Sequence, residues 1–387
     1  MAAAVPSPGN PHVEIIEEGM REGMQIESAS IGIDDKLRLL DALGRTGLGA
    51  INVGSFVSPK WVPQMAEIDE LLARFEPVPG VRYFALALNQ KGVERRAAYQ
   101  GTKLAVEPPV GVTAVHLCDV FVKRNNNIGR ADEIAALPER VRRAVEQGVT
   151  EASIRINAAW GSNWLGEFGL DERLDLLQQQ YDLWSAAGIA VTSTWIGDPM
   201  SWNTPRAVEE TLAAMVERFP TIRRYHLHLH DGRGMALLSA YQAFRTLRPE
   251  HTLVLDSSIG GMGGCPYCGN GRATKMIPTE DLVHLLEAEG VTTGIDLPAV
   301  IEAAHLAEEV VGHELYGHVS KAGPRPDADH LYPMDMPFVE TIEQAQHFRL
   351  GPSTYDGCPS PYKTPITSPA RDAIDRARTT ESTQESR

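Results

Sequence analysis

The feature of this chain that most constrains its fold is a regular alternation of short apolar segments with longer amphipathic ones. The segments typical of β-strands are residues 13–16, 50–54, 83–88, 114–117, 152–156, 190–195, 225–229 and 253–257. Helical patterns lie between most of them, most clearly over residues 170–187, 207–219 and 234–247. Eight strands that alternate with helices over about 250 residues predict an α/β fold of the (β/α)₈ TIM-barrel type. A doubly wound sheet is the alternative.

The same patterns divide the chain into four regions. Residues 1–11 are expected to form a flexible leader and residues 12–321 the barrel, which ends on a helical pattern over 297–310. Residues 322–370 are rich in proline, glycine and aromatic side chains and are expected to form a C-terminal extension. Residues 371–387 are polar and are expected to be disordered.

The composition argues against several classes of partner. The chain has 36 basic and 51 acidic residues, a net charge of −15, which argues against nucleic acid and membranes as partners. Four cysteines in 387 residues do not make a disulfide scaffold. The first ten residues lack the features of a signal peptide, and no uninterrupted apolar run has membrane-spanning length. We therefore expect a cytoplasmic protein.

Polar residues gather where the predicted strands end. TIM barrels build their active sites at the C-terminal ends of the strands, from the loops that follow them. The polar residues at these ends are Arg21, Glu22, Asn52, His228, His230 and, after the eighth strand, Cys265. Because the strand ends of a barrel meet at one mouth, these side chains are expected to form one site.

A histidine pattern on the seventh predicted strand indicates a metal site. His226, His228 and His230 share one face of the strand, because strand side chains alternate with period two. Two imidazoles at the strand end can bind one divalent ion, and Glu22 can add an anionic oxygen. These ligands suit Mg²⁺ or Mn²⁺, and also Zn²⁺ or Fe²⁺. His226, deeper in the barrel, is expected to be structural, and a set of core histidines is the alternative interpretation.

Cys265 is carried by a loop with glycines at 260, 261, 263 and 264. A run of glycines indicates a backbone that bends sharply or moves, so the thiol can be delivered to a site built elsewhere. Cys265 and Cys268 also form a C-x-x-C motif, and a redox thiol protein is therefore an alternative. The motif lies deep in a long chain rather than near the start of a small thioredoxin-like domain.

Several segments resemble a known family. The most specific are residues 55–65 (SFVSPKWVPQM), 228–231 (HLHD), 261–267 (GMGGCPY) and 279–282 (TEDL). Together they resemble 3-hydroxy-3-methylglutaryl-CoA lyases, of the metal-dependent (DRE-type) TIM-barrel superfamily that also contains isopropylmalate and homocitrate synthases. The resemblance extends over residues 13–315.

The resemblance implies roles for individual residues. His228 and His230 would be metal ligands, and Glu22 stands where the family has an aspartate ligand. Arg21 matches a catalytic arginine that neutralises a thioester enolate. Cys265 matches a loop cysteine that transfers a proton to or from the acetyl-CoA carbon.

Other positions depart from the family pattern. Its asparagine ligand lies nine residues after the cysteine, where this chain has Thr274, so Asn270 is the expected substitute. Asn52 stands where the family has a functional glutamate. The residues expected to contact substrate are Gln25, Asn52 and Asp198, and Asp231 is expected to relay a proton.

These expectations together predict a divalent-metal-dependent carbon–carbon lyase. Its substrate would be a 3-hydroxy-3-methylglutaryl-CoA-like acyl-CoA or hydroxy acid, cleaved to a keto acid and acetyl-CoA, and the protein is expected to form a homodimer. One alternative is a Claisen-type synthase that runs the reaction in the opposite direction. Another is an inactive barrel that binds a partner protein.

Overall fold

A computed structural model describes residues 9–87, 89–339, 341, 357, 359–364 and 366–385 of the chain. The predicted leader therefore lies mostly outside the described residues, as do much of the predicted extension and the last two residues. The chain divides into two compact units, Met1–Ser320 and Lys321–Arg387.

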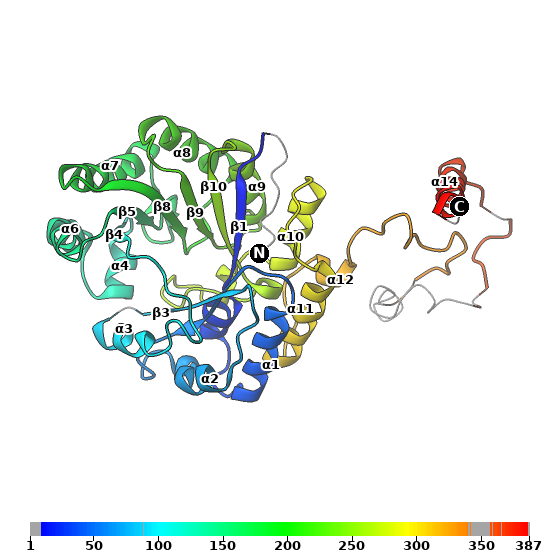
Figure 1. The fold of residues 1–387 in the computed structure, drawn as a ribbon, viewed down its shortest axis with the longest axis horizontal. Helices are drawn as coiled ribbons and strands as arrows, with labels where there is room; N and C mark the ends of the chain where they lie inside the picture. The colour runs from blue at the N-terminus through cyan, green and yellow to red at the C-terminus, as the bar shows by residue number, and fades with distance from the viewer. Residues whose placement is uncertain are drawn as a thin grey trace. The chain divides into compact units, whose positions relative to one another are not determined.

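The first unit is built on eight parallel strands that form one curled sheet (Figure 1). The strands are β1 (His12–Glu17), β2 (Ala50–Ser55), β3 (Arg82–Leu86), β4 (Gly111–His116), β5 (Glu151–Asn157), β8 (Ala190–Asp198), β9 (Arg224–Leu229) and β10 (Thr252–Ser257). Their order in the sheet is β3-β2-β1-β10-β9-β8-β5-β4. All eight predicted strands are therefore present, although Leu88, the last residue of the predicted third strand, lies outside the described residues.

The pairing of the first strand with the last one identifies the fold. β1 and β10 are parallel and in register from His12 opposite Thr252 to Glu17 opposite Ser257. Each remaining strand then lies beside its neighbour in the sequence, which is the order of a (β/α)₈ barrel and not of a doubly wound sheet. Among the described residues β3 and β4 are not hydrogen-bonded to each other, so the sheet is open between them. The TIM-barrel prediction is confirmed.

Helices follow the strands and cover the outside of the sheet (Figure 1). They are α1 (Ile33–Gly44), α2 (Ile68–Arg74), α3 (Gln90–Ala97), α4 (Asp119–Asn126), α5 (Arg130–Ala135), α6 (Leu137–Glu146), α7 (Leu170–Ala186), α8 (Pro205–Arg218), α9 (Ala236–Thr246), α10 (Thr279–Ala288), α11 (Leu297–Val311) and α12 (Val319–Ala322). A short hairpin, β6 (Gly161–Ser162) and β7 (Gly166–Glu167), follows β5. The sequence patterns did not indicate this hairpin.

Local sequence signals explain where two of the long helices, α8 and α11, begin. The Thr204 hydroxyl accepts a hydrogen bond from the Ala207 N–H at 3.2 Å, and Pro205 occupies the first turn of α8. Asp296 caps α11 in the same way, accepting from the Ala299 N–H at 3.1 Å. Such caps satisfy N–H groups that have no partner within the helix.

The strands separate an apolar layer from a polar interior. On β5, Ile154 and Ile156 are fully buried against the helices. Ser153, Arg155 and Asn157 alternate with them and line a cavity of about 1830 Å³ inside the barrel. Because side chains alternate along a strand, polar side chains can line the inner face of the barrel while apolar side chains on the outer face form the core with the helices.

The second unit contains the helix α14 (Pro369–Glu385). This segment was expected to be disordered because of its polar composition, and the structure instead makes it helical over most of its length. In the part of the chain that the structure describes, no helix is both long enough and apolar enough to cross a membrane.

Candidate active site

The site begins at a tight turn directly after β1. A π-helical turn, η1 (Gly19–Gly23), carries Arg21 and Glu22 and runs into a 3₁₀ turn, η2 (Met24–Ile26). A Cβ atom on Gly19 would lie 2.6 Å from Oε1 of Glu17. Gly19 thus lets the Glu17 carboxylate come close enough to accept the Gly19 backbone N–H at 2.7 Å, at the point where the chain leaves the strand.

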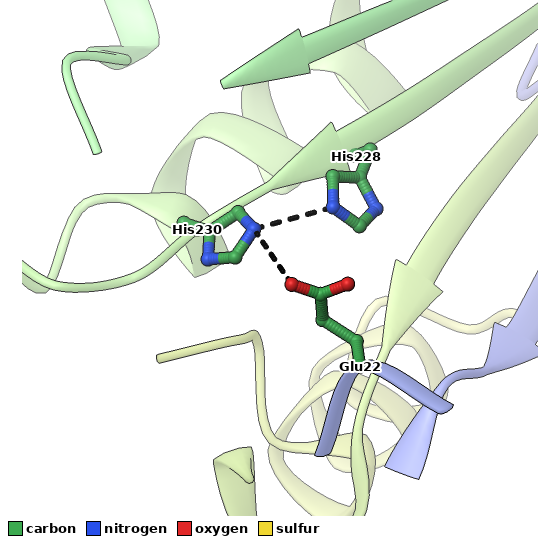
Figure 2. Close-up of side chains that lie close together, drawn as sticks. All are labelled: Glu22, His228 and His230. Carbon is green, nitrogen blue, oxygen red and sulfur yellow. Dashed lines mark hydrogen bonds and ion pairs between the residues drawn. The ribbon is translucent and has the colours of Figure 1, made fainter. Parts of the chain in front are cut away.

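Glu22, His228 and His230 form a cluster of metal-ligand type (Figure 2). One ligand atom from each residue lies within 4.8 Å of the other two, and all three side chains are buried. The Nε2 atoms of the two histidines are 3.2 Å apart, and His230 Nε2 lies 3.8 Å from Glu22 Oε1. Two imidazoles and one carboxylate that converge in this way fit a divalent cation with open coordination positions for a substrate.

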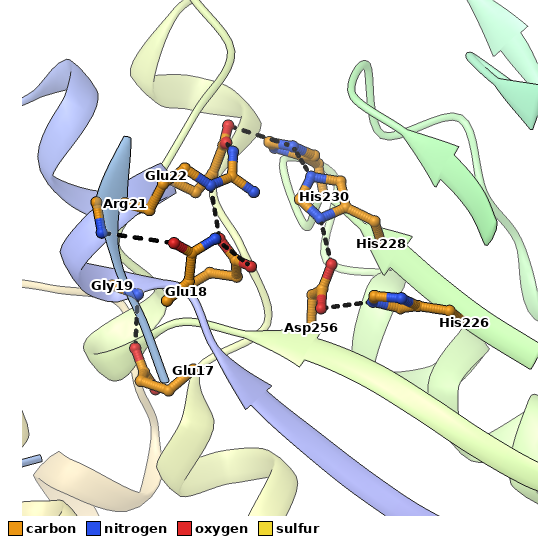
Figure 3. A network of polar contacts seen from close by, with 11 residues as sticks. Glu17, Glu18, Gly19, Arg21, Glu22, His226, His228, His230 and Asp256 are labelled. Atoms are coloured by element: carbon orange, nitrogen blue, oxygen red, sulfur yellow. Dashed lines mark hydrogen bonds and ion pairs between the residues drawn. The ribbon is translucent and has the colours of Figure 1, made fainter. Parts of the chain in front are cut away.

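Asp256, at the end of β10, orients the histidines (Figure 3). Its two carboxylate oxygens accept hydrogen bonds from His226 Nε2 and His228 Nδ1, each at 2.7 Å. Burial would raise the pKa of Asp256, but the two imidazoles lower it well below its usual range. Burial keeps the pKa of His230 well below its usual value, and the neighbouring His228 adds to the effect. A neutral imidazole is the form that binds a metal.

A second buried carboxylate, Glu18, lies beside the cluster (Figure 3). The Asn52 amide donates to both of its oxygens at 3.2 Å, and Arg21 Nε donates to Oε2 at 2.7 Å. Burial raises the pKa of Glu18 to about 7, and the charge of Arg21 opposes that rise. Arg21 also hydrogen-bonds to Glu22 through Nη1, so its guanidinium bridges the two carboxylates.

The cysteine loop follows β10. Gly260, Gly261, Gly263 and Gly264 all have positive φ, from 62° to 152°, a conformation that other residues rarely adopt. Cys265 is buried, lines the same cavity as Glu22 and His230, and donates its backbone N–H to the Thr274 hydroxyl at 2.8 Å. The loop thus places a thiol above the metal-ligand cluster.

Cys268 is also buried, and its thiol donates to the Pro199 carbonyl at 3.1 Å. The hydrogen bond with Cys265 and burial raise the pKa of Cys268 above its usual range. A thiol in this state is a poor nucleophile, which does not favour the redox interpretation of the C-x-x-C motif.

The structure brings most of the predicted site residues to one cavity. Those that line it are Arg21, Glu22, Gln25, Asn52, His228, His230 and Cys265. Three predicted residues do not line the cavity. Asn270 is exposed on the cysteine loop. The Asp198 carboxylate accepts hydrogen bonds from the backbone N–H and the side-chain amide of Asn203, at 2.6 and 2.7 Å. Asp231 Oδ1 accepts a hydrogen bond from the Ala236 N–H at 2.7 Å. In the structure, Asp198 and Asp231 thus hold loops rather than face the cluster.

The sequence analysis missed two polar residues of the site, Glu18 and Asp256, and an aromatic one, Trp195. Asp256 lies on a predicted strand, and its period-two position facing inward was an available signal. The Trp195 ring stacks on His228 with centroids 5.4 Å apart and planes 27° from parallel. No local pattern marks that contact, because it depends on the register between two strands.

Comparison with known proteins identifies the family of the barrel. A family model described as HMGL-like matches residues 12–307, which is the whole barrel up to α11. The chain belongs to the HMGL-like family. The membership confirms the resemblance that the sequence motifs indicated, and it identifies the chain as a carbon–carbon lyase.

Similar proteins carry lyase names. This HMGL-like chain is 33% identical over 312 residues to the 3-hydroxy-3-isohexenylglutaryl-CoA/hydroxy-methylglutaryl-CoA lyase of Pseudomonas aeruginosa, covering 80% of this chain and 96% of that one. It is 29% identical over 310 residues to the mitochondrial hydroxymethylglutaryl-CoA lyase of Bos taurus, covering 80% and 89% of the two chains.

Solved structures of lyases share the fold. An HMG-CoA lyase of Acinetobacter baumannii, in complex with coenzyme A and 3-methylmalate, matches with a TM-score of 0.66 and 26% identity, over 83% of this HMGL-like chain and 97% of that chain. A hydroxymethylglutaryl-CoA lyase of Pseudomonas aeruginosa matches with a TM-score of 0.65 and 30% identity, over 81% and 97%.

Proposed function

We propose that this HMGL-like lyase cleaves 3-hydroxy-3-methylglutaryl-CoA, or a 3-hydroxyacyl-CoA related to it, in a reaction that depends on a divalent metal. The observation that carries the proposal is the convergence of Glu22, His228 and His230 beside Arg21 and Cys265 at one barrel mouth. Metal ligands, a cation and a thiol in one cavity are the groups that such a cleavage requires.

Glu22, His228 and His230 would hold the metal, and Mg²⁺ or Mn²⁺ are the ions we propose. A bound divalent ion is a Lewis acid, and it lowers the pKa of a hydroxyl group that approaches it. Asp256 keeps the Nε2 atom of His228 aimed at Glu22 and His230, because its carboxylate fixes the opposite ring nitrogen.

Glu18 is the group that we propose as the acceptor of the tertiary hydroxyl proton. It lines the cavity and is buried, and its pKa of about 7 suits a general base at neutral pH. As the hydroxyl loses its proton, the new C=O bond forms and the bond between the carbinol carbon and the thioester α-carbon breaks. The electron pair of that bond passes to the thioester, which becomes an enolate.

Arg21 and Cys265 then act on the enolate. The Arg21 guanidinium is held by Glu18 and Glu22, so it can stabilise the developing oxygen charge without reorganising. The Cys265 thiol donates a proton to the carbon and yields acetyl-CoA. Solvent returns a proton to the thiolate and removes the one held by Glu18, so that the cycle balances.

The glycine loop would control access of water. An enolate in contact with water is protonated before the intended group can act, so such sites close before the bond breaks. The four glycines before Cys265 have positive φ, a conformation that other residues rarely adopt, so the shape of this loop depends on them.

The test is a panel of 3-hydroxyacyl-CoA substrates with Mg²⁺ or Mn²⁺, followed by mass spectrometry. We expect release of acetyl-CoA and a keto acid in equal amounts, and loss of both when a chelator removes the metal. A parallel incubation of acetyl-CoA with keto acids measures the synthase direction. Absence of cleavage of every substrate in the panel would contradict the proposal. The acidic charge and the low cysteine content are consistent with a cytoplasmic enzyme.

A further inference from the structure

The segment of the cysteine loop directly after Cys265 is tied to two elements that lie far away in the sequence. Arg124, on α4, donates from Nε to the Tyr267 carbonyl at 2.9 Å. Asn163, at the turn between β6 and β7, donates from its side-chain amide to the Cys268 carbonyl at 3.1 Å. Both acceptors are backbone carbonyls within three residues of Cys265. The loop that follows β10 is therefore held by segments that follow β4 and β5.

An aromatic side chain connects the two donors and the loop. The Arg124 guanidinium lies over the Trp164 ring, 5.2 Å from its centroid, and Trp164 directly follows Asn163. A Cβ atom on Gly269 would lie 3.4 Å from the same ring, so the loop passes close to the indole. A guanidinium over an aromatic face is a favourable contact. Trp164 thus fixes the Arg124 side chain at the place where the loop passes.

Asn163 is itself oriented by neighbouring side chains. Its Oδ1 accepts from Trp202 Nε1 at 3.0 Å and from Arg233 Nη2 at 3.3 Å. Because both bonds use the amide oxygen, the amide nitrogen is left for the Cys268 carbonyl. Arg233 is in turn anchored, since its Nη1 donates to the Met200 carbonyl at 2.6 Å. The donor to the loop therefore has a defined direction before the loop reaches it.

We propose that Arg124 and Asn163 form a latch that holds the cysteine loop closed and so positions the Cys265 thiol at the metal-ligand cluster. The inference rests on the proposed function, in which that thiol protonates the enolate. Both residues act through the carbonyls of Tyr267 and Cys268, and they are positioning residues rather than catalytic ones. With the latch released, the thiol would leave the cluster and water would reach the site.

The strength of the latch suits a loop that opens in every cycle. Each of its hydrogen bonds is replaced by one to water when the loop opens, so each contributes only modestly to the closed state. The loop must open for substrate to enter and for product to leave, and it must close before the bond breaks. A few modest bonds to backbone carbonyls allow both.

The experiment measures how fast iodoacetamide alkylates each cysteine of the full chain with Mg²⁺ present, with mass spectrometry of peptides to identify the site. Cys265 is 8% exposed, so its alkylation reports opening of the loop. Cys118 is the internal reference. It is fully buried at the start of α4, and its thiol donates to the Ser162 hydroxyl at 3.0 Å, next to the hairpin turn. Unfolding of either supporting element would expose Cys118 as well.

Two variants release the latch in different ways. Arg124→Gln removes the charged donor. Asn163→Asp keeps an oxygen for the side chains that donate to it and removes the N–H group that reaches the loop. We expect each change to speed alkylation of Cys265 by about 3- to 10-fold, and the double variant by more. The rate at Cys118 should not change.

Lys123→Gln is the matched control, because it removes a cation of the same helix that donates within its own segment, to the Asn127 carbonyl at 3.5 Å. It should keep the wild-type alkylation rate. For cleavage of 3-hydroxy-3-methylglutaryl-CoA, kcat should fall across the variants in the order in which alkylation of Cys265 rises. Mn²⁺ affinity should be equal in all of them, since no metal ligand is changed.

Three results would overturn the inference. They are an unchanged alkylation rate of Cys265 in the double variant, an equal acceleration at Cys118, and a wild-type kcat in variants whose Cys265 reacts faster. Alkylation requires no substrate. A loop that is released as expected in a protein that cleaves no acyl-CoA would therefore count against the proposed function alone.

Discussion

The Nδ1 atom of His228 lies 2.7 Å from Oδ2 of Asp256, and this contact turns the opposite ring nitrogen toward Glu22 and His230. Such a carboxylate fixes the tautomer and the orientation of a ligating imidazole. Asp256→Asn should therefore weaken Mn²⁺ binding by about 10- to 100-fold, measured by calorimetry.

The matched control for Asp256 is Glu133→Gln. Glu133 also accepts from a buried imidazole, His116 Nδ1 at 2.9 Å, but it lies outside the cavity. Its substitution should leave Mn²⁺ affinity within about 2-fold, since it removes a pair of the same kind without touching the cluster. Equal losses in both variants would mean that the effect is a general one on folding.

Cys265→Ser should lower kcat by about 100-fold or more, because a serine hydroxyl is a far weaker acid than a thiol. Metal affinity should not change, since the thiol lies on the loop above the ligands. Cys268→Ala should keep most of the activity, because Cys268 donates to the Pro199 carbonyl rather than to the reacting atoms. Steady-state kinetics of the two variants separates them, and equal loss of activity in both would revive the redox interpretation.

Glu18→Gln should lower kcat by about 100-fold if Glu18 accepts the hydroxyl proton. The pKa of Glu18 is about 7, and a base must be ionised to act, so wild-type activity should fall as the pH drops below 7. The residual activity of Glu18→Gln should lack that dependence. If Glu18→Gln kept the pH dependence of the wild-type activity, a group other than Glu18 would be responsible for it.

Glu280 gives a prediction about stability. It is fully buried at the start of α10, where it accepts from the Gly260 N–H at 3.0 Å, and burial raises its pKa from 4.5 to about 8. The folded protein therefore binds a proton that the unfolded chain releases between these values. The free energy of unfolding should fall as the pH rises from 4.5 to 8, by up to about 1.4 kcal/mol per pH unit from this group.

Glu280→Gln tests this sign directly, because a glutamine carries no charge to bury. Compared with wild type, the variant should gain stability as the pH rises toward 8, and its unfolding free energy should depend less on pH. Burial also raises the pKa of Glu17, to about 7. Because Glu17 is still present in the variant, part of the pH dependence of the unfolding free energy should remain. Denaturation measured at several pH values gives the unfolding free energy of both proteins. The same dependence on pH in wild type and variant would contradict this account.

The fold could be predicted from the sequence because its determinants are local. Each strand is a short apolar run, and two of the long helices begin at a capping side chain, Thr204 for α8 and Asp296 for α11. The helix α14 was harder to predict, because its polar sequence shows no apolar stripe even though its residues tolerate a helix.

The site could be predicted only in part. His228 and His230 follow from period-two spacing on one strand, and Cys265 from its glycines. Glu18 was missed because it follows another glutamate, and only the structure shows that Glu17 turns outward to the Thr279 hydroxyl while Glu18 faces the cavity. Asn270 was expected near the metal because it is the only asparagine between Cys265 and Thr279, but the structure leaves it exposed.

The contacts among the residues directly beneath the metal-ligand cluster could not be predicted from the sequence. Arg155, Trp195 and His226 come from three strands separated by long helical segments. They become neighbours only through the register of β5 with β8 and of β8 with β9. The register between two strands cannot be read from the sequence of one segment, because it depends on how the strands pair across the whole sheet.

The most direct test of the central claim is cleavage of 3-hydroxy-3-methylglutaryl-CoA in D₂O with Mg²⁺, analysed by mass spectrometry of the acetyl-CoA formed. In D₂O the Cys265 thiol carries deuterium, so carbon protonation of the enolate should place one deuterium in each acetyl group. Label and product should both disappear with a chelator, and product formation should fall sharply in Cys265→Ser. Acetyl-CoA that forms without deuterium, or at the same rate without metal, would contradict the account.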